Sequence, residues 1–485
     1  MVKTKQNGQV YTPIEVIREM LDMVLFNLTF LPDIIIANRR HIIDNSCGDG
    51  RMLMAAVERA CEAYKTVQIS KADCISYLEE CVHGIELDPV EWALCIKNLN
   101  NLVESYGLPS IKWDIRNCDA LSCHDFDGKM DFIIGNPPYV RVHNLDIDSI
   151  KDYSFAKGGM TDLYLAFYEL GFKMLNPDGG RMVYISPSSW FTSVAGQGLR
   201  DYILKRQNLV AIKDYGHMQI FEGAQTYVAI SLFTGDGNIH YPFYTFVPEG
   251  KEESKPLAKY LVDGKFYFGD TQQLELLRGV MGNKTKAFRV KNGYATLADD
   301  VFITENTLIP QAPEWEKPNN KYLRYVVKAS TGVRQHMIYP YDENGKLVSE
   351  EELKTNSPNE YHWLAMNKER LLSRATDYEW YAFGRSQAIN DTYSFKYSVS
   401  SIVSDKVKVK IKPCGVGNGV YGGLYILPLL ENDRFEEEDW LKYTLWSDEF
   451  FSYVKSLRKY KSGGYYTFSS KDLENYLNYK WCGKK

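Results

Sequence analysis

The first half of the chain alternates short apolar runs with longer stretches in which apolar residues recur at helical spacing. The short runs have the length of strands, and they occupy residues 41–44, 81–88, 115–121 and 131–135. Helical spacing fills the intervening stretches 13–24, 51–60 and 89–102. Strands that alternate with helices predict an α/β, Rossmann-like domain built on a largely parallel sheet.

A polar side chain follows each of the four apolar runs: Asp44, Glu86, Asp119 and Asn136. Because open α/β sheets bind ligands at the carboxyl ends of their strands, these four residues predict one binding site. A carboxylate after the second strand commonly binds ribose hydroxyls. Taken singly, each acid is also compatible with a cap or a solvated loop, and Glu86 with a cap for the helix at 89–102.

The fourth strand runs into Asn136-Pro137-Pro138-Tyr139. The two prolines lack N–H donors and disfavour helical backbone before them, so they predict a stiff, extended turn. A planar substrate with an NH2 group could donate to the Asn136 side-chain oxygen and the Pro137 carbonyl, and stack on Tyr139. A Pro-Pro turn with a packing tyrosine is the alternative, and the tetrapeptide alone does not decide between them.

The loop after the first strand, residues 45–50, reads Asn-Ser-Cys-Gly-Asp-Gly. Glycines here let the backbone approach a ligand and aim helix N–H groups at it. The loop does not match the dinucleotide pattern G-x-G-x-x-G, so by itself it leaves cofactor binding open. Upstream, Thr12 before Pro13 is typical of a helix N-cap followed by proline at the first helical position.

The second half of the chain has a different character. Residues 248–255 are charged and loop-like, and from Phe288 onward the sequence is rich in aromatic residues, short strands and turns. These changes predict an α/β domain at residues 1–245, a connecting segment at 246–287 and a mixed α+β domain at 288–485.

Two stretches of this second half mix basic and aromatic residues. The first is a strip in which every second residue is basic, which predicts one face of a strand: Lys406, Lys408, Lys410 and Lys412. The second, residues 453–461, contains Lys455 and Arg458. Contact with nucleic-acid phosphates and an ordinary solvated lysine face both remain open for these stretches. Before both stretches in the sequence stand Arg385 and Gln387. The side chain of Arg385 suits the edge of guanine, and that of Gln387 suits the edge of adenine.

Composition narrows the class of protein. The 485 residues exceed what one hydrophobic core holds, and the net charge of -5 excludes an overall basic coat. The nine cysteines form no CxxC pair and no Cys/His cluster at zinc spacing, so we expect reduced thiols and no metal. Polar residues interrupt the apolar stretch at 20–36. We therefore expect no membrane span, no signal peptide, and a soluble cytoplasmic monomer.

The ordered set of motifs resembles the gamma-type, amino-group DNA methyltransferases of the Taq I type. In that family a Y-T-P segment and an acid-led glycine loop precede a strand-tip acid, a second aspartate, an N-P-P-Y turn and a target-recognition region. All occur here in that order, and further matches lie at residues 158–164, 179–187, 221–226, 295–303, 380–387 and 463–468. One departure is the loop, where the family often has a Pro-Ala pair in place of Asn45-Ser46.

The resemblance implies a catalytic domain dependent on S-adenosylmethionine, followed by a DNA-binding target-recognition domain. It implies that Asn136, Pro137, Pro138 and Tyr139 are catalytic. The residues expected to bind the cofactor are Tyr11, Thr12, Pro13, Asp44, Cys47, Gly48, Gly50, Glu86, Leu87, Asp119 and Ala120. Those expected to contact the flipped base or the DNA are Tyr139, Phe221, Arg385, Gln387, Lys408, Lys410, Lys455 and Arg458. For Phe221 the alternative is a core phenylalanine at the start of a strand.

The implied reaction is methylation of the N6 amino group of an adenine flipped out of double-stranded DNA, in a bacterial or archaeal cell. Asn136 at the head of the turn favours adenine over cytosine N4, which is also an exocyclic amine. A C5-cytosine enzyme would need a Pro-Cys nucleophile where this chain has Pro-Pro.

Three alternatives remain open from the sequence. The same catalytic family includes methyltransferases of ribosomal RNA guanine and of protein glutamine, although these generally lack a large aromatic second domain. An inactive DNA-binding homologue is disfavoured by the intact turn and acids. A fused restriction–modification enzyme is disfavoured because the Y-T-P segment begins the chain, so we expect any cognate endonuclease to be a separate chain.

Overall fold

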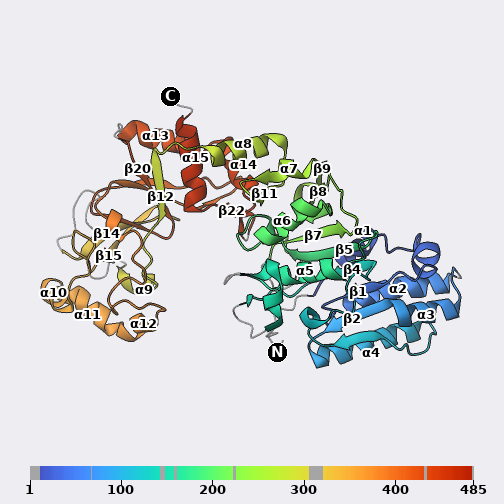
Figure 1. Ribbon diagram of the computed structural model, residues 1–485. Coiled ribbons are helices and arrows are strands. Elements are labelled where there is room, and N and C mark those ends of the chain that lie inside the picture. The colour runs from blue at the N-terminus through green and yellow to red at the C-terminus, as the bar shows by residue number, and fades with distance from the viewer. Residues whose placement is uncertain are drawn as a thin grey trace. The chain divides into compact units, whose positions relative to one another are not determined.

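The computed structural model describes residues 11–66, 68–142, 148–157, 161–221, 226–304, 321–430, 434–461 and 463–482. The chain divides into two compact units, residues 1–269 and 270–485, coloured from blue to green and from yellow to red (Figure 1). The predicted connecting segment, 246–287, is divided between the two units.

The first unit contains the alternating elements expected from the apolar pattern. Its α-helices are α1 (Ile14–Met23), α2 (Arg51–Lys65), α3 (Lys71–Cys81), α4 (Pro89–Ser105), α5 (Tyr164–Met174), α6 (Gln197–Arg206) and α7 (Leu257–Tyr260). Its π-helical and 3-10 turns are η1 (Leu31–Ile36), η2 (Ala120–Ser122), η4 (Asp148–Asp152), η5 (Ser154–Ala156), η6 (Ser188–Phe191) and η7 (Val247–Glu249). The strands are β1 (Ile42–Asp44), β2 (Val82–Glu86), β3 (Asp114–Asn117), β4 (Phe132–Gly135), β5 (Arg181–Pro187), β6 (Leu209–Asp214), β7 (Val228–Thr234), β8 (Phe243–Phe246), β9 (Lys251–Ser254), β10 (Leu261–Val262) and β11 (Lys265–Phe266).

In the described residues, nine strands form one sheet in the order β3-β2-β1-β4-β5-β7-β6-β8-β9. The strands from β3 to β5 are parallel, whereas β7 is antiparallel to both β5 and β6. The predicted α/β class with a largely parallel sheet is confirmed. The strand order reverses between β1 and β4, so the loops after these two strands diverge and leave a ligand-sized crevice between them.

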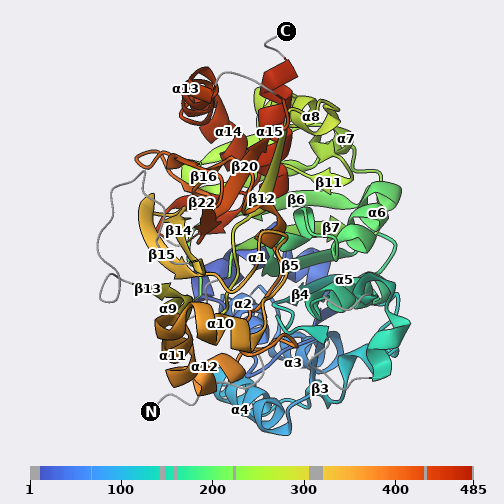
Figure 2. The ribbon, with the colours of Figure 1, turned by 90° about the vertical axis from the view of Figure 1, so that its left-hand side faces the viewer.

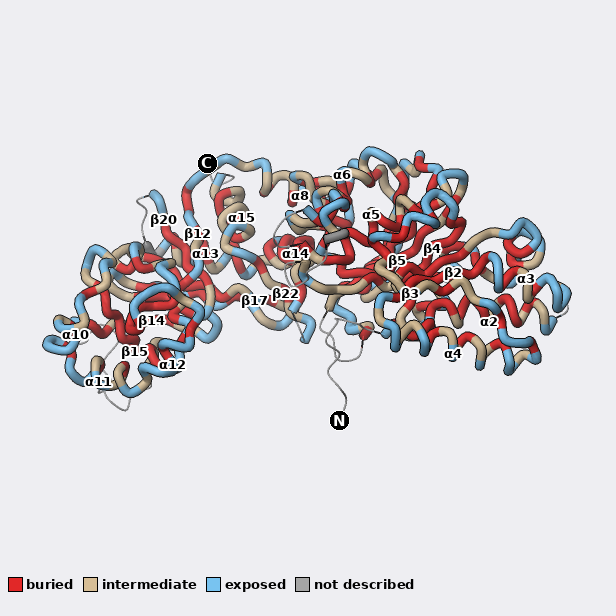
Figure 3. Tube along the Cα trace, turned by 60° about the horizontal axis from the view of Figure 1, so that its bottom comes forward, coloured by how far each residue is buried: buried red, intermediate tan, exposed pale blue. Residues whose placement is uncertain are grey.

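The strands are buried because helices cover both faces of the sheet. One face packs against α1 to α4 in a single apolar core, and the neighbouring side chains of the same strands point to the other face, where α5 contacts β5. Figure 3 shows β2, β4 and β5 in red, as expected for strands that are buried on both faces.

Two expectations for the first unit are wrong. Thr12 is not the N-cap of α1, because Pro13 occupies that position and no side chain caps the helix. The loop expected at 248–255 contains β9, which pairs with β8 at the edge of the sheet. A turn through Gly250, with φ 61, joins the two strands, and the charged residues of β9 suit an exposed sheet edge.

The second unit combines short sheets with helices. Its sheets are β12-β20-β16-β18, β13-β15-β14-β19 and β17-β22-β21. The strands are β12 (Phe288–Asn292), β13 (Ile303–Thr304), β14 (Leu323–Lys328), β15 (Val333–Ile338), β16 (Lys396–Val399), β17 (Ile402–Val403), β18 (Ile411–Cys414), β19 (Gly419–Tyr421), β20 (Leu424–Pro428), β21 (Tyr460–Lys461) and β22 (Tyr465–Thr467).

Helices from both ends of this unit pack together. The helix α8 contacts both α14 and α15, and α14 contacts α15 through the stacked rings of Tyr453 and Tyr476. The helix α15 also lies along β12 (Figure 2). The helices are α8 (Thr271–Gly282), α9 (Asp299–Phe302), α10 (Glu350–Asn356), α11 (Pro358–Met366), α12 (Lys368–Leu372), η8 (Ile389–Asp391), α13 (Arg434–Leu445), α14 (Asp448–Ser456) and α15 (Ser470–Cys482). None of the helices in the described ranges is long and apolar enough to cross a membrane.

The strand expected to carry the alternating lysines begins later than predicted. Only Lys412 lies in β18, so the prediction is wrong for residues 406–410, which form no strand. Serine side chains bind this backbone instead, since Ser404 Oγ accepts from the N–H of Val407 at 3.1 Å and Ser400 Oγ from Lys410 at 2.9 Å. Such side-chain bonds compete with strand pairing.

Candidate functional site

A cavity of about 600 Å³ lies at the carboxyl ends of β1, β2 and β4, where the strand order predicts a ligand site. Its wall includes most of the residues predicted for cofactor and catalysis. These are Tyr11, Thr12, Asp44, Cys47, Gly48, Glu86, Leu87, Asp119, Ala120, Asn136, Pro137, Pro138 and Tyr139. Pro13 and Gly50 flank the cavity without lining it.

Glu86 at the end of β2 holds the glycine loop rather than the following helix. Its Oε2 accepts from the N–H of Gly48 at 2.8 Å, and its Oε1 accepts from the N–H of Asp88 at 2.8 Å. The N-cap of α4 is Asp88, whose carboxylate accepts from Val90 and Glu91, so the capping alternative for Glu86 is wrong. Asp119, by contrast, does cap a short helix, because it accepts from Leu121 at 3.0 Å.

Asp44 at the end of β1 is a buried carboxylic acid. The residue is 2% exposed, and its Oδ1 accepts from the N–H of Ser46 at 3.0 Å. Burial is the main cause that raises its pKa to about 7, the Ser46 bond opposes that shift, and the nearby Glu86 carboxylate adds to it. A cation bound in the cavity would therefore stabilise the ionised form of Asp44.

The two glycines of the loop serve different purposes. Gly48 has φ 53, and a Cβ there would meet no atom within 4 Å, so its backbone is open on the side where a side chain would project. Gly50 has φ 88, and its Cβ would lie 2.7 Å from Cys95 Sγ on α4. Gly48 therefore leaves the loop backbone accessible, whereas Gly50 permits close packing of α2 against α4.

The turn after β4 is held by residues far away in sequence. The Asn136 side-chain amide donates to Thr12 Oγ1 at 3.2 Å, and the Tyr139 hydroxyl donates to the Ile185 carbonyl at 3.1 Å. The Tyr139 ring lies 6.2 Å from that of Phe221 and 6.4 Å from that of Tyr164. These contacts fix the plane of the tyrosine at the cavity wall.

Phe221 is 1% exposed and belongs to the apolar core of the first unit. It lies between β6 and β7 rather than at the start of a strand. The structure therefore brings Phe221 next to Tyr139 but places its ring among core side chains. Its role in holding a base stays a prediction.

The comparisons with known proteins agree with this geometry. Residues 63–221 match the model of the Eco57I restriction-modification methylase family. The chain is 25% identical over 394 residues to the Type II methyltransferase M.BstVI of Geobacillus stearothermophilus, covering 71% of this chain and 68% of that protein. It is 23% identical over 374 residues to M.PaeR7I of Pseudomonas aeruginosa, covering 70% of this chain and 64% of that protein.

The chain is related to the methyltransferases of restriction-modification systems. A longer relative, the restriction enzyme and methyltransferase RM.Eco57I of Escherichia coli, is 23% identical over 66% of this chain, which spans only 38% of that protein. The relatives support a DNA methyltransferase over the RNA and protein alternatives. The methylase family implies S-adenosylmethionine as the cofactor.

Solved structures show the same fold at low identity. The Type IIL enzyme MmeI in complex with DNA matches 94% of this chain and 65% of its own with a TM-score of 0.58 and 14% identity. A nuclease-deletion mutant of the Type ISP enzyme LlaGI with a DNA substrate mimic matches 97% of this chain and 46% of its own, again with a TM-score of 0.58 and 14% identity. The α/β methyltransferase fold of the first unit and the mixed fold of the second agree with both.

Several residues that line the cavity of the first unit were not predicted. Arg51, the first residue of α2, lies 3.7 Å from the ring centroid of Tyr11 and pairs with Asp49 at 3.0 Å. Its place directly after Gly-Asp-Gly was a usable signal. Asn45, Leu163 and Phe167 also line the cavity. Asn45 and Leu163 belong to segments that the sequence singled out, residues 45–50 and 158–164, whereas nothing in the sequence distinguished Phe167.

Tyr139 and Phe221 lie in the first unit, and the other residues predicted to contact DNA lie in the second unit. These other residues differ in how many contacts their side chains make. Gln387 Nε2 donates to the Gly293 carbonyl at 2.6 Å, whereas the exposed Arg385 pairs with Ala295 through its backbone. Lys408 and Lys410 are exposed. Lys455 and Arg458 are half-buried near the C-terminal end of α14, where they lie beside Phe451 and Tyr460 respectively.

Parts of two predicted motifs lie outside the described residues. These are residues 158–160, and residues 222–225 after Phe221.

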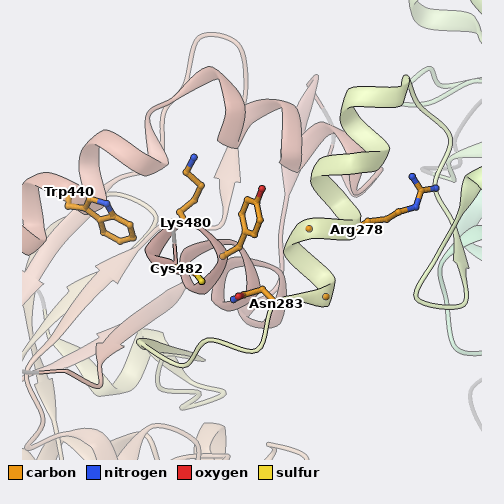
Figure 4. A pocket seen from close by; sticks show the side chains of 8 residues that line it. Arg278, Asn283, Trp440, Lys480 and Cys482 are labelled. Atoms are coloured by element: carbon orange, nitrogen blue, oxygen red, sulfur yellow. The ribbon is translucent and has the colours of Figure 1, made fainter. Parts of the chain in front are cut away.

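A second cavity of about 740 Å³ lies in the second unit between α8, α13 and α15. Figure 4 shows Trp440, Lys480, Asn283 and Cys482 around it, with Arg278 extending to the other side of α8. Lys480 is paired with Glu449 at 3.0 Å, and Trp440 stacks on Phe288 with centroids 5.4 Å apart. None of the residues predicted for function lines this cavity.

Proposed function

We propose that the protein is a site-specific DNA methyltransferase that transfers the methyl group of S-adenosylmethionine to the N6 amino group of an adenine in double-stranded DNA. In this proposal it is the modification component of a restriction-modification system that acts with a separate cognate endonuclease. The observation that carries it is the position of Asn136-Pro137-Pro138-Tyr139 in the wall of the same cavity as Asp44, Glu86 and Asp119.

The residues present fit the cofactor. Three carboxylates stand after successive strands in the order β3, β2, β1, and neighbouring strands are about 4.8 Å apart. Asp119 and Glu86 therefore suit the nucleoside end, and Asp44, next to β4, suits the cationic methionine end. Tyr11, Thr12 and Pro13 would close over the methionine end, and Cys47, Gly48, Leu87 and Ala120 would contact the cofactor along the wall. When bound, S-adenosylmethionine supplies an electrophilic methyl group.

Asn136 and Pro137 would orient the acceptor. The lone pair of an adenine amino group is delocalised into the ring, which makes the nitrogen a poor nucleophile. Hydrogen bonds from its two N–H groups to the Asn136 side-chain oxygen and the Pro137 carbonyl would favour a tetrahedral nitrogen. The stiffness of the Pro137-Pro138 turn keeps both acceptors in place, so transfer depends on position and preorganised dipoles.

Tyr139 would stack on the base after it leaves the duplex, a movement that costs a few kcal/mol. Its hydroxyl is bound to Ile185, so the ring has a fixed orientation before the base arrives. Phe221 would support the tyrosine or hold the second face of the base. A fixed ring lowers the entropy cost of holding the base.

The second unit would bind the DNA flanking the target, with the lysine strip as its main phosphate contact. Lys410 Nζ donates to the Thr331 carbonyl at 3.4 Å, and Lys412 lies along Gly332, so the strip adjoins the tip of the β14–β15 hairpin. Other lysines of this unit are neutralised by carboxylates, as Lys291 is by Asp391 at 2.6 Å. Within the described residues, none of the strip's lysines has such a carboxylate partner.

Methyl-sensitive long-read sequencing of DNA from cells that express the chain tests the proposal. We expect N6-methyladenine within one short motif, and we expect Asn136→Ala to abolish it while cofactor binding survives. Unmodified DNA with newly methylated protein or ribosomal RNA would overturn the proposal. Methylation confined to cytosine N4 would overturn the adenine assignment alone.

A further inference from the structure

Tyr184 lies on β5 and passes across the neighbouring strand β4. It is fully buried, and its register partner on β4 is Gly135, the residue before Asn136. A Cβ at Gly135 would lie 2.9 Å from Tyr184 Cε1 and 3.2 Å from Cδ1. The absence of a side chain at Gly135 therefore lets the tyrosine ring cover the backbone from which the catalytic turn begins.

On the far side of β4, the Tyr184 hydroxyl reaches the loop that follows β1. Asn45 Nδ2 donates to this hydroxyl at 2.7 Å, and the hydroxyl donates to the Phe167 carbonyl on α5 at 3.4 Å. Asn45 is fully buried, as is Tyr184. One tyrosine thus contacts the cofactor loop, the start of the catalytic turn and a helix that also lines the cavity.

We propose that Tyr184 is a positioning residue that fixes residues 45–50 against the catalytic turn, and thereby sets the separation between methyl donor and acceptor. This inference rests on the proposed function for the meaning of that separation. Misplacement of reacting groups by about 1 Å can lower a rate by about 100-fold, so a rigid connection between the two loops has a direct effect on transfer.

The loop needs such a connection because residues 45–50 contain no proline and two glycines, so only hydrogen bonds and packing fix its backbone. The β2 side of the loop is already held, because Cys47 N donates to the Ile85 carbonyl at 3.0 Å and Gly48 to Glu86. The Asn45–Tyr184 bond holds the opposite side.

The test compares the full-length chain with Tyr184→Phe, Asn45→Ala and the double variant. Tyr77→Phe is the matched control, because Tyr77 is equally buried in the same unit and its hydroxyl donates to the Arg40 carbonyl at 3.1 Å. Hydrogen exchange by mass spectrometry follows the peptide covering residues 45–50 without DNA. Calorimetry gives the dissociation constant of S-adenosylmethionine, and single-turnover assays give the transfer rate.

We expect faster exchange of residues 45–50 in Tyr184→Phe and Asn45→Ala, and unchanged exchange there in Tyr77→Phe. Transfer should slow by about 10- to 100-fold, with the cofactor dissociation constant within about threefold, because geometry rather than binding is lost. The double variant should be no slower than the slower single variant, since both remove the same bond.

Exchange in the loop no faster than in Tyr77→Phe would overturn the inference, and so would additive losses in the double variant. A weaker cofactor affinity that accounts for the whole loss of rate would also overturn it. The exchange measurement needs no methyl acceptor. If the protein methylates no DNA, the proposed function fails while the loop connection is still decided by exchange alone.

Discussion

The side-chain amide of Asn136 donates to the hydroxyl of Thr12 at 3.2 Å, across 124 positions of sequence. This bond joins the segment before the first helix to the turn after the fourth strand. It also fixes which way the Asn136 amide faces, because its nitrogen is directed to Thr12 and its oxygen to the other side of the group.

Removal of the Thr12 hydroxyl should make the orientation of the Asn136 amide less fixed, without changing the volume of the side chain at position 12. We expect Thr12→Val, which preserves side-chain volume, to lower the single-turnover rate roughly fivefold to tenfold, since one such hydrogen bond contributes about 1 kcal/mol. Thr66→Val is the control, because Thr66 Oγ1 binds only its own helix, at Glu62 and Ala63. An unchanged rate in Thr12→Val would show that the bond has no part in orienting Asn136.

Cofactor affinity should rise with pH through the pKa of Asp44, which burial raises to about 7. The protonated carboxyl of the cofactor-free protein must ionise to pair with a cationic methionine end, so binding should weaken by up to about tenfold per pH unit below 7. Calorimetry in buffers of different ionisation enthalpy should detect proton release at pH 6. Asp44→Asn should bind more weakly at pH 8 and lose this pH dependence; a wild-type affinity that is flat from pH 6 to 8 would contradict the assignment.

The raised pKa of Asp44 has the opposite effect on the stability of the cofactor-free protein, which should fall as pH rises. In the unfolded chain the Asp44 carboxyl has the ordinary aspartate pKa of 3.8, which is below its pKa in the folded chain. Between about pH 4 and pH 7 the unfolded chain therefore ionises this carboxyl and the folded chain does not. Its contribution therefore favours the folded state at low pH and is lost as pH rises toward 7. Thermal unfolding of wild type and Asp44→Asn over this range should diverge, with the wild type losing more stability as pH increases. Parallel curves would rule out the raised pKa.

The lysines of the strip should determine how strongly the affinity for DNA falls as the salt concentration rises. Because each neutralised phosphate releases counterions, we expect Lys410→Ala with Lys412→Ala to reduce the slope of log affinity against log salt by about 2. The loss should be similar for cognate and unrelated DNA. Lys471→Ala is the control, since this exposed lysine pairs with Glu474 at 3.0 Å. A slope equal to that of the control would place the phosphate contacts elsewhere.

Arg385 and Gln387 should respond differently to truncation. Arg385→Ala should relax recognition at one base position, because an arginine pair to guanine contributes about 1–3 kcal/mol of discrimination. Gln387→Ala should instead lower stability slightly, since its side chain already binds the Gly293 carbonyl at 2.6 Å. Sequencing of the methylated motif separates the two. An unchanged motif in Arg385→Ala would remove this residue from base reading.

The sequence predicted those parts of the site that follow from the order of neighbouring residues along the chain. Asp44, Glu86 and Asn136 each end an apolar run, and parallel strands bring such ends to one edge whatever the details of packing. Contacts between distant residues could not be predicted in this way. Nothing near Thr12 indicates a partner 124 residues away, and nothing near Tyr184 indicates Asn45. The strand predicted for the lysine strip is wrong for a local reason. The side chains of Ser400 and Ser404 bind the backbone that the alternating pattern assigned to a strand.

A fragment ending at Gly269 should fold and bind cofactor, whereas one ending at residue 245 should not. Residues 246–269 complete the first unit: Phe268 stacks on Tyr244 with centroids 4.6 Å apart, and the Gly264 carbonyl accepts from the buried Arg200 at 2.8 Å. The shorter fragment loses both and leaves a buried guanidinium with one acceptor fewer, which is costly in a core. Calorimetry with S-adenosylmethionine and thermal unfolding compare the fragments. Equal stability would show that β9 and the residues after it are dispensable, and sequence-specific methylation by the longer fragment would refute a recognition role for the second unit.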